Sequence, residues 1–397
     1  MQCTRNVTNH IIWVGANDRR LNLFENLFPI PRGVSYNAYL IKDEKNTLMD
    51  TVDASASRQF IENVAYALNG ESLDYLVVQH MEPDHCANIQ KILELYPEAK
   101  VVGNAKTMQM IGQFFDVDLE DRKIVVKEGD TLELGSHTLH FVMAPMVHWP
   151  EVMVSYEASE KILFSADAFG TFGALNGNLF NDDVDFEKDW IDDARRYFTN
   201  IVGKYGPQVQ KLLKAAATLD IQTICPLHGP VLNENLDFYL NLYQTWSAYE
   251  PEDKGVLIAY TSVYGNTKKA AELLAQMLVD KGCEKVAITD LARDDIAEAV
   301  EDAFRYDRLV LATTTYNGDV FPFMREFIES LTERNYQKRT IGLIENGSWA
   351  ATAAKVMRQL FEKSKEITFT ETTVKIMSAL NEESTTQLEN LAEELCK

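Results

Sequence analysis

The sequence has few cysteines, and none of them is spaced as in a metal-binding module. The five cysteines are scattered along 397 residues, and no Cys-x-x-C pair occurs. This absence excludes an iron–sulfur or rubredoxin module within the chain. Cys86 and Cys225 stand next to loops that are rich in histidine and carboxylate side chains. We expect both to be small buried side chains rather than metal thiolates, because those loops already offer enough ligands.

Long hydrophobic runs are missing as well. No stretch approaches the roughly 18 apolar residues of a membrane-spanning helix. Residues 1–6 show no signal-peptide pattern, and there is no internal repeat or low-complexity tract. We therefore expect a cytoplasmic protein that makes no contact with a membrane.

Basic residues are in the minority. The chain has 38 lysines and arginines against 60 aspartates and glutamates, which gives a formal net charge of −22. A surface of this charge repels phosphate backbones, so the composition argues against nucleic-acid binding. The fractions of apolar residues, 46%, and charged residues, 25%, are those of a globular protein. The chain is too long for one ordinary core, and two domains are expected.

One stretch carries four potential metal ligands within six residues. The apolar run Tyr75–Val78 has the pattern of a buried strand and leads directly into a turn with His80, Glu82, Asp84 and His85. Two imidazoles and two carboxylates suit a divalent first-row metal of intermediate hardness. Taken alone, this loop is also compatible with an ordinary polar turn.

Three further ligand-type residues support the metal interpretation. His148, Asp167 and His228 each lie just past an apolar stretch that has the pattern of a strand. Strand ends converge on one edge of a layered β structure, so the seven side chains are expected to meet. Seven ligands are too many for one tetrahedral metal and about right for two metals that share a bridging carboxylate.

The spacing of these seven residues resembles the diiron motif of flavodiiron proteins, a family that includes the rubredoxin:oxygen oxidoreductases. The pattern runs His-x-Glu-x-Asp-His, then His after 62 residues, Asp after 18 and His after 60. That family is built on the metallo-β-lactamase fold, whose zinc hydrolases carry His-x-His-x-Asp-His in the same loop. This chain has Glu82 at the deciding position. A carboxylate is a harder ligand than histidine and favours iron redox chemistry over zinc hydrolysis.

The first part of the chain is predicted to be rich in strands. Short apolar stretches such as Ser35–Ile41 alternate with turn residues, and helical spacing is confined to residues 60–68, 189–218 and 236–246. This pattern predicts two sheets flanked by helices. By resemblance, residues 1–250 form a metallo-β-lactamase-like αββα sandwich that carries the diiron site.

The second part of the chain is predicted to be a doubly wound α/β domain over residues 251–397. The composition changes at residues 247–255, a polar run with one proline and no periodicity, which is typical of a linker. Five strand–helix pairs follow and predict a five-stranded parallel sheet with right-handed crossovers. The pairs are Val256–Tyr260 with Thr267–Asp280, Val286–Asp290 with Ile296–Ala303, Leu309–Ala312 with Phe323–Thr332, Arg339–Ile344 with Ala350–Phe361, and Val374–Met377 with Glu383–Cys396.

The first loop of this second part is rich in hydroxyl groups and contains a glycine. At a helix N-terminus such a loop favours a phosphate, because free N–H groups and the helix dipole attract an anion. No Gly-Lys-Ser/Thr occurs, which argues against a nucleoside triphosphate. The loop resembles the flavodoxin phosphate loop, with tyrosine in place of the usual threonine at one position, where we expect the backbone N–H to contribute. The predicted phosphate-binding residues are Ser262, Val263, Tyr264, Gly265, Asn266 and Thr267.

Two further loops follow the third and fourth strands, at the strand ends where ligands of open sheets bind. Each places an aromatic residue beside small polar ones, as flavin loops of the family do, although Thr314 stands where relatives commonly have proline. The rings of Tyr316 and Trp349 are expected to pack on the isoalloxazine of FMN; the alternative is packing in the core. The predicted flavin contacts are Thr315, Tyr316, Asn317, Gly318, Ser348, Trp349 and Ala350.

The resemblance covers nearly the whole chain and implies an oxidoreductase with FMN and two non-haem irons. It implies reduction of O2 to water, of NO to N2O, or of both, with electrons from rubredoxin or a similar small donor. It also implies a head-to-tail homodimer or a dimer of dimers. Tyr197 is a candidate hydrogen-bond donor to oxygen species at the metals, or else a buried structural tyrosine. By resemblance His80, Glu82 and His148 hold one iron, Asp84, His85 and His228 hold the other, and Asp167 bridges, although some relatives leave the histidine at position 85 off the metal.

Three other functions remain open at this stage. The chain could be a zinc hydrolase fused to a flavodoxin-like domain, although Glu82 would then have to serve a zinc site. A pure electron-transfer flavoprotein would leave seven ligand-type residues unexplained. A non-enzymatic O2 or NO sensor would need an output module, and two domains already account for the chain.

Overall fold

The computed structural model describes residues 2–397, which form two compact units. The first unit comprises the chain up to Phe198 together with Pro207–Tyr243, and the second comprises Thr199–Gly206 and Gln244–Lys397. The chain therefore passes between the units more than once, and the predicted single boundary at residue 250 stays a prediction. No helix within residues 2–397 is long and apolar enough to cross a membrane.

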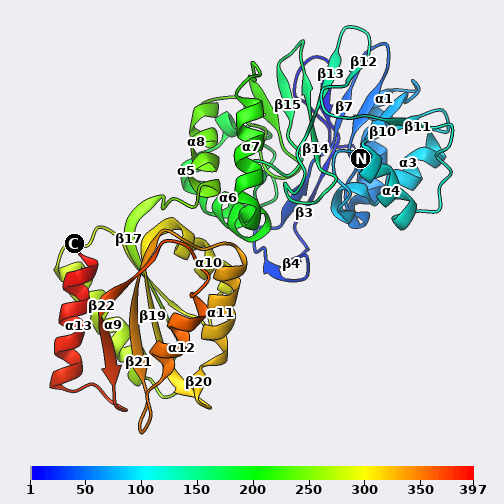
Figure 1. Cartoon of the computed structure of the whole chain (residues 1–397). Coiled ribbons are helices and arrows are strands. Elements are labelled where there is room, and N and C mark those ends of the chain that lie inside the picture. The colour runs from blue at the N-terminus through cyan, green and yellow to red at the C-terminus, as the bar shows by residue number, and fades with distance from the viewer. Residues whose placement is uncertain (1) are drawn as a thin grey trace. The chain divides into compact units, whose positions relative to one another are not determined.

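A seven-stranded mixed sheet forms one layer of the first unit (Figure 1). Its order is β1-β2-β7-β8-β9-β10-β11. The pairs from β1 to β8 are antiparallel and those from β8 to β11 are parallel. The strands are Arg5–Asn6 (β1), Ile11–Trp13 (β2), Tyr39–Ile41 (β7), Thr47–Met49 (β8), Tyr75–Val77 (β9), Lys100–Gly103 (β10) and Lys123–Val125 (β11).

A five-stranded sheet forms the second layer, in the order β12-β13-β14-β15-β16. Only the last pair, β15 with β16, is parallel. The strands are Thr131–Glu133 (β12), Thr138–Met143 (β13), Met153–Glu157 (β14), Ile162–Phe164 (β15) and Thr223–Cys225 (β16). Two short two-stranded antiparallel sheets accompany the layers, β3 (Ala16–Asp18) with β6 (Val34–Tyr36) and the hairpin of β4 (Leu23–Phe24) with β5 (Phe28–Pro29).

The two sheets pack face to face and helices cover their outer sides. The ring of Tyr39 on β7 lies 5.5 Å from that of Phe164 on β15, and its hydroxyl donates to the carbonyl oxygen of Pro226 beyond β16. Figure 1 shows α1, α3 and α4 on one outer side and α7 and α8 on the other. The predicted αββα sandwich is confirmed. The helices are α1 (Ser57–Leu68), α2 (Pro83–Cys86), α3 (Ile89–Leu95), α4 (Ala105–Phe114), α5 (Phe186–Asp189), α6 (Ile191–Tyr197), α7 (Gly206–Ala216) and α8 (Leu236–Ser247), with short 3-10 turns η1 (Ala54–Ala56), η2 (Asn181–Asp183) and η4 (Gly203–Tyr205).

Two predicted elements are interrupted in the structure. The strand predicted over 35–41 is split into β6 and β7, because Asn37 turns its backbone N–H and its side-chain amide to carbonyl groups of residues 226–229. The helix predicted over 189–218 is broken by a π-helical segment, η3 (Phe198–Val202), directly after Tyr197. π-Helical turns are rare and are frequent at functional sites.

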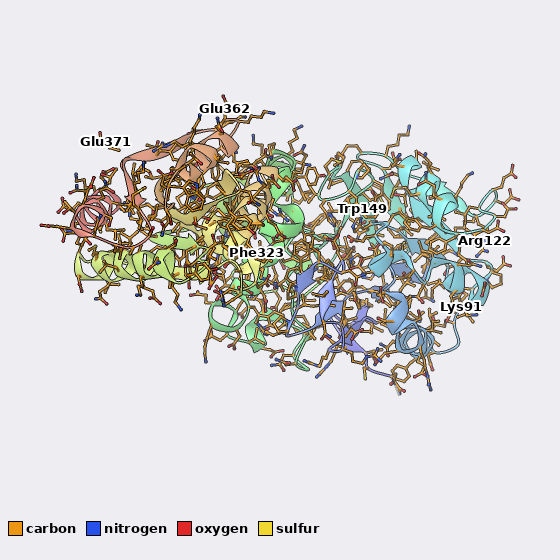
Figure 2. The ribbon with its side chains drawn as sticks, turned by 90° about the horizontal axis from the view of Figure 1, so that it is seen from below. Lys91, Arg122, Trp149, Phe323, Glu362 and Glu371 are labelled. Carbon is orange, nitrogen blue, oxygen red and sulfur yellow. The ribbon has the colours of Figure 1, made fainter. Side chains whose placement is uncertain are left out.

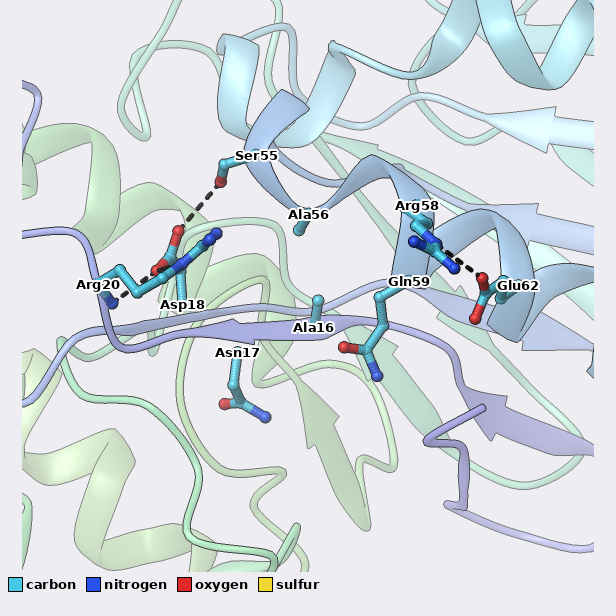
Figure 3. A pocket seen from close by; sticks show the side chains of 9 residues that line it. All are labelled: Ala16, Asn17, Asp18, Arg20, Ser55, Ala56, Arg58, Gln59 and Glu62. Atoms are coloured by element: carbon cyan, nitrogen blue, oxygen red, sulfur yellow. Dashed lines mark hydrogen bonds and ion pairs between the residues drawn. The ribbon is translucent and has the colours of Figure 1, made fainter. Parts of the chain in front are cut away.

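The end of β3 contacts the 3-10 turn η1, which directly precedes α1, and Figure 3 shows the hydrogen bond between Asp18 and Ser55. Asp18 accepts hydrogen bonds from the backbone N–H groups of Arg20 and Leu21 at 2.7 and 3.2 Å, and Ser55 donates its hydroxyl to Asp18 at 3.1 Å. A cavity of about 310 Å³ lies beside these residues. The contacts hold the chain just before the β4–β5 hairpin, which begins at Leu23.

The second unit has one sheet, in which the short strand β20 pairs antiparallel with β19 and the five main strands are parallel in the order β18-β17-β19-β21-β22. In chain order this is second, first, third, fourth, fifth, the flavodoxin-like arrangement. The predicted doubly wound five-stranded sheet is confirmed. Its elements are β17 (Asp253–Tyr260), α9 (Asn266–Asp280), β18 (Val286–Asp290), α10 (Ile296–Arg305), β19 (Tyr306–Tyr316), β20 (Asp319–Val320), α11 (Pro322–Glu333), β21 (Arg339–Asn346), α12 (Ala353–Leu360), β22 (Ile367–Ile376) and α13 (Glu382–Leu395).

Alternate residues of the central strands face opposite sides of this sheet. On β17, Leu257 and Ala259 pack with α10, α11 and α12, whereas Val256 and Ile258 pack with α9 and α13. Because side chains alternate along a strand, both faces become apolar and both need a helical layer. The loops at the carboxyl ends of the strands are left free of this packing and can bind a ligand.

Candidate metal centre and flavin loops

The structure brings all seven predicted ligands together at the ends of β9, β13, β15 and β16. None of the seven is more than 8% exposed. Asp84 and His85 lie on the one-turn helix α2, which begins with a proline, a residue suited to the first helical position. The seven residues fall into two groups. Within each group, one ligand atom of every residue lies within 4.8 Å of those of the others.

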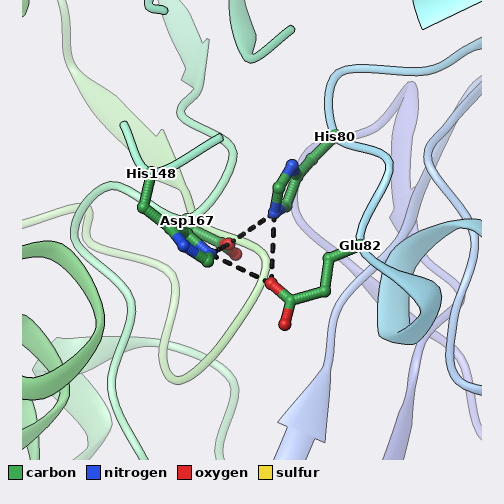
Figure 4. Close-up of side chains that lie close together, drawn as sticks. All are labelled: His80, Glu82, His148 and Asp167. Carbon is green, nitrogen blue, oxygen red and sulfur yellow. Dashed lines mark hydrogen bonds and ion pairs between the residues drawn. The ribbon is translucent and has the colours of Figure 1, made fainter. Parts of the chain in front are cut away.

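The first group consists of His80, Glu82, His148 and Asp167 (Figure 4). The Nε2 atom of His148 lies 2.9 Å from Oε2 of Glu82 and 3.2 Å from Oδ2 of Asp167. The Nε2 atom of His80 lies 3.3 and 3.1 Å from the same two oxygens. Two imidazole nitrogens and two carboxylate oxygens therefore surround one point.

The second group consists of Asp84, His85 and His228. The Nε2 atoms of the two histidines are 3.0 Å apart, and each lies 3.3 Å from Oδ2 of Asp84. Oδ1 of Asp167 lies 3.2 Å from Nε2 of His85 and 3.7 Å from Nε2 of His228. The two oxygens of Asp167 thus face different groups, which is the geometry that a bridging carboxylate needs.

Two of the three carboxylates of this cluster, Asp84 and Asp167, have only histidine ring nitrogens as polar neighbours in the part of the chain that the structure describes, at 3.1 Å or more. Both oxygens of Asp84 and both of Asp167 are buried and accept no hydrogen bond from residues 2–397. An unsatisfied buried acceptor is costly, and a native structure rarely keeps several in one place. The donor set, four imidazoles with three carboxylates, fits two metal cations, and these would satisfy the orphaned oxygens.

The pKa shifts in the cluster also indicate an excess of negative charge. Burial opposes protonation of His80, but the neighbouring carboxylates, Asp167 foremost, raise its pKa well above the usual range. The same balance raises the pKa of His148 to about 9. Burial alone would raise the pKa of Asp167, yet His85 and His80 hold it well below its usual range. The carboxylate charge that raises the pKa of His80 and His148 would equally favour bound cations.

Two of the four imidazole rings are fixed by a hydrogen bond at Nδ1, the ring nitrogen that faces away from the cluster. Nδ1 of His80 lies 2.9 Å from a carboxylate oxygen of Glu151, and Nδ1 of His228 lies 2.7 Å from the carbonyl oxygen of Ser35. A proton on Nδ1 leaves the lone pair of each ring on Nε2, which faces the cluster. Sequence reasoning did not identify Glu151, although it follows His148 by only three residues.

Asp50 is a second residue that the sequence did not reveal. It accepts hydrogen bonds from the backbone N–H and the side-chain amide of Gln79, at 2.7 and 2.9 Å, and from the N–H of His80 at 3.3 Å. Complete burial raises the pKa of Asp50 to about 6. Its φ of 57° lies in the left-handed region, which is uncommon for a residue other than glycine. Asp50 holds the ligand loop in place where β9 ends.

Two aromatic residues border the cluster. Trp149, labelled in Figure 2, lies edge-on to His80 at 5.4 Å between ring centroids and 6.2 Å from His148. Tyr197 is fully buried with its ring 5.5 Å from that of His228, and its hydroxyl has no hydrogen-bond partner in residues 2–397. Burial, together with the carboxylates of the cluster, raises the pKa of Tyr197 well above its usual value, so the hydroxyl keeps its proton.

A cavity of about 280 Å³ gives access to two of the ligands. The β4–β5 hairpin forms one wall with Leu23 and Phe24, and Glu82 and Asp84 lie on the opposite wall. A cavity of this size holds a small molecule, and four carboxylate residues line it, Glu25 and Asp53 as well as Glu82 and Asp84, which disfavours an anion.

Replacing Glu151 with glutamine is expected to loosen the metal centre without removing a ligand. The amide oxygen can still accept from His80 and Met81, because one carboxylate oxygen now accepts both hydrogen bonds, at 2.9 and 2.8 Å; what glutamine loses is the charged contact of the carboxylate with the His80 ring. Losing such a contact typically weakens metal binding by about 10- to 100-fold. Iron retained after dialysis against a chelator measures the effect. Glu98→Gln, an exposed carboxylate of the same unit, is the matched control, and equal retention in both variants would contradict the role.

The predicted phosphate loop joins β17 to α9. It turns at Gly265, whose φ of 93° suits glycine, and Ser262 accepts a hydrogen bond from the Gly265 N–H at 3.0 Å. No side chain of residues 2–397 caps the start of α9, so its first N–H groups are free to bind an anion. Thr267 is buried and accepts a hydrogen bond from Asn346 at 3.4 Å, which links this loop to the end of β21. The side chain of Tyr264 is 94% exposed and takes no part in these contacts.

The other two predicted flavin loops present their aromatic rings to solvent. Asn317 and Gly318 both have positive φ and make a two-residue turn between β19 and β20. Thr315 accepts hydrogen bonds from the N–H groups of Thr352 and Ala353 and so fixes the start of α12. Tyr316 is 44% exposed and Trp349 is 90% exposed. Core packing, the alternative considered for these two rings, is wrong.

Both halves of the chain match known families. A model described as ODP family beta lactamase matches residues 34–229, and one described as flavodoxin domain matches residues 257–385. The anaerobic nitric oxide reductase flavorubredoxin of Escherichia coli is 31% identical over 354 residues, which cover 87% of this chain and 73% of that protein. An uncharacterised protein of Methanocaldococcus jannaschii is 30% identical over 90% of this chain and 88% of its own length.

Solved structures of related proteins match this chain over nearly its full length. The rubredoxin oxygen:oxidoreductase of Desulfovibrio gigas matches with a TM-score of 0.92 and 27% identity, covering 99% of this chain and 98% of that one. The flavodiiron protein of Giardia intestinalis has the same fold, with a TM-score of 0.90 and 22% identity over 100% of this chain and 97% of that one. These similarities confirm the resemblance that the ligand spacing suggested, and the chain belongs to the flavodiiron protein family.

Proposed function

We propose that this oxidoreductase reduces dioxygen to water, nitric oxide to nitrous oxide, or both, with electrons from rubredoxin or a similar small carrier. Its cofactors are FMN and a non-haem diiron centre. The observation that carries the proposal is the position of Asp167, whose two oxygens face two separate groups of ligands. Relatives named for reduction of nitric oxide and of oxygen support both gases as substrates.

We assign one metal to each of the two groups of side chains described above, and we propose that Asp167 bridges the two metals. Once bound, the irons and the FMN supply redox chemistry that no amino-acid side chain provides. The chain's own contribution is to fix the donor atoms, as Glu151 does for His80 and the carbonyl of Ser35 does for His228. The first metal would be held by His80, Glu82 and His148, and the second by Asp84, His85 and His228.

His85 is proposed as a ligand of the second metal, and it is the least constrained of that group. Its Nε2 atom faces Asp84, His228 and Asp167. Its Nδ1 atom, by contrast, is buried and makes no hydrogen bond within residues 2–397. No second contact therefore fixes this ring, and it can turn more easily than the ring of His228.

Tyr197 is proposed to hold a proton beside the reacting gas. Its hydroxyl is buried, unpartnered and protonated, and the cluster carboxylates lie close enough to raise its pKa. Full reduction of dioxygen to two waters takes four electrons and four protons, and conversion of two nitric oxide molecules to nitrous oxide and water takes two of each. A hydroxyl that keeps its own proton can donate a hydrogen bond to the oxygen of the reacting gas, and this is the role proposed for Tyr197.

On the second unit, the loop 262–267 is proposed to bind the FMN phosphate, with the exposed start of α9 as its anion site. Tyr316 and Trp349 are proposed to cover the isoalloxazine, since both rings are exposed at the carboxyl edge of the sheet. The remaining proposed contacts are Thr315, Asn317, Gly318, Ser348 and Ala350.

Rapid mixing of the fully reduced, iron-loaded protein with each gas tests the function. We expect reoxidation of the flavin within seconds by dioxygen, by nitric oxide or by both, and the ratio of the two rates gives the preference. Protein that carries zinc in place of iron should show no gas reduction, because zinc has no redox chemistry. If the zinc form hydrolysed esters or amides and the iron form consumed neither gas, the protein would be a hydrolase and the proposal would be wrong.

A further inference from the structure

A second cluster of metal-ligand side chains lies at the other end of strands β13 and β15. His137 immediately precedes β13 and Glu160 lies two residues before β15, whereas the diiron ligands follow the same strands. His10, directly before β2, completes the cluster. One nitrogen or oxygen atom from each of these three residues lies within 4.8 Å of the other two. None of the three belongs to the diiron motif.

One carboxylate oxygen of Glu160 faces both imidazole rings. Oε1 lies 2.7 Å from Nδ1 of His10 and 3.6 Å from Nε2 of His137. The second distance is too long for a hydrogen bond. The two rings stand at a steep angle to each other, with centroids 5.1 Å apart. Their nitrogens and the oxygen therefore surround a small space that is not filled by a direct bond between His137 and Glu160.

Asp43 binds Nδ1 of His137, as a carboxylate often binds the outer ring nitrogen of a metal-binding histidine. Oδ2 of Asp43 accepts hydrogen bonds from the backbone N–H and from Nδ1 of His137, both at 2.7 Å. Asp43 is itself held by the hydroxyl of Ser136 and the N–H of Glu44. With the proton on Nδ1, the lone pair of the neutral ring lies on Nε2, which faces Glu160. A carboxylate behind a histidine is the usual second contact at metal sites.

The charges of the cluster favour a cation. Its two carboxylates, Asp43 and Glu160, form ion pairs only with His10 and His137, and no lysine or arginine within residues 2–397 pairs with either. When both histidines are neutral, two negative charges remain without compensation. The side chain of Asp43 is only 7% exposed, so water screens its charge poorly, whereas Glu160 is partly exposed.

We propose that His10, His137 and Glu160 bind a divalent cation of the zinc class, with water as a further ligand. Two imidazoles and a carboxylate form the donor set of open zinc sites. The side chains of His10 and Glu160 are 53% and 22% exposed, so a metal ion can enter from solvent. His10 belongs to the loop before β2 of the first sheet, and the other two belong to turns of the second sheet. The metal would therefore clamp the two sheets together at the end away from the diiron site.

Zinc content after equilibrium dialysis tests the site in the iron-loaded, flavin-loaded protein. Dialysis against micromolar zinc, followed by elemental analysis, should give zinc in addition to the full iron content. His10→Ala should weaken the binding of this zinc at least about tenfold. Glu160→Gln should do the same while it preserves the shape of the side chain. His140→Ala removes a histidine of β13 that lies outside the cluster and should retain the zinc.

Measuring iron and zinc in the same samples distinguishes the two metal sites. A zinc gain matched by an iron loss would place the zinc in the diiron centre and overturn the proposal. Equal zinc binding by the wild type, His10→Ala and Glu160→Gln would overturn it as well. An anomalous-scattering peak between His10, His137 and Glu160 in zinc-soaked crystals would support it, and soaked crystals without that peak would count against it.

Discussion

Replacing Asp167 with alanine is expected to abolish gas reduction while leaving the flavin bound and reducible. Asp167 has one oxygen toward each of the two ligand groups, so its loss would remove the proposed bridge between the metals. Substituting a residue that hydrogen-bonds a metal ligand typically lowers metal affinity or activity by about 10- to 100-fold. Loss of the bridging residue itself should lower activity by more than that. Gas consumption by the reduced protein gives the activity, elemental analysis gives the iron, and absorbance gives the flavin.

The control for this variant is Asp182→Ala, which removes an exposed carboxylate of the same unit. It should retain iron, flavin and activity. Unfolding curves of both variants must show the native transition, since the loss of Asp167 also removes one carboxylate partner from each of four histidines. Retention of activity and full iron content in Asp167→Ala would exclude a bridging role. Loss of flavin together with iron would mean that the two cofactor sites are not independent.

The ligand positions could be predicted because each depends on local sequence. A strand that ends in a polar turn places the next few side chains at one edge of the sheet, and this holds for His80, His148, Asp167 and His228 alike. The second unit was predictable for the same reason: each strand, turn and helix is continuous along the chain. Asn317 and Gly318 even determine their own turn, because both tolerate positive φ.

The residues behind the ligands could not be predicted, because their roles depend on contacts across the fold. Glu151 reaches His80 over 71 positions of sequence, and Ser35 reaches His228 over 193. The sequence around Asp50 is that of an ordinary strand end. Only its hydrogen bonds to Gln79 show that it holds the ligand loop in place. The break at Asn37 likewise follows from hydrogen bonds to residues nearly 200 positions away. A single sequence contains no signal for such pairs.

We propose further that the protein is a head-to-tail homodimer in which the FMN of one chain serves the metals of its partner. A twofold interface is self-complementary, so one contact surface can close both flavin–metal pairs at once. Electrons would then cross between chains. If electrons cross between chains, two inactive variants can form an active mixed dimer. A monomer, or electron transfer within one chain, would give no such recovery of activity.

Co-expression of two inactive variants is expected to recover about a quarter of wild-type activity. One variant lacks the metal bridge and a ligand, Asp167→Ala with His228→Ala. The other lacks the two loop hydroxyls, Ser262→Ala with Thr267→Val, which should weaken FMN retention and spare the iron. Random association makes about half of the dimers mixed, and each mixed dimer holds one intact pair of the two possible.

Different affinity tags on the two chains allow the mixed dimers to be isolated, and their activity per dimer should be about half that of the wild type. The matched control pairs Asp167→Ala with His228→Ala on separate chains. Both of these lack part of the metal centre, so no pairing of chains restores an intact site, and this mixture should stay inactive. Purified mixed dimers of the first kind that contain FMN on one chain and iron on the other, yet reduce neither gas, would show that electrons do not cross between chains.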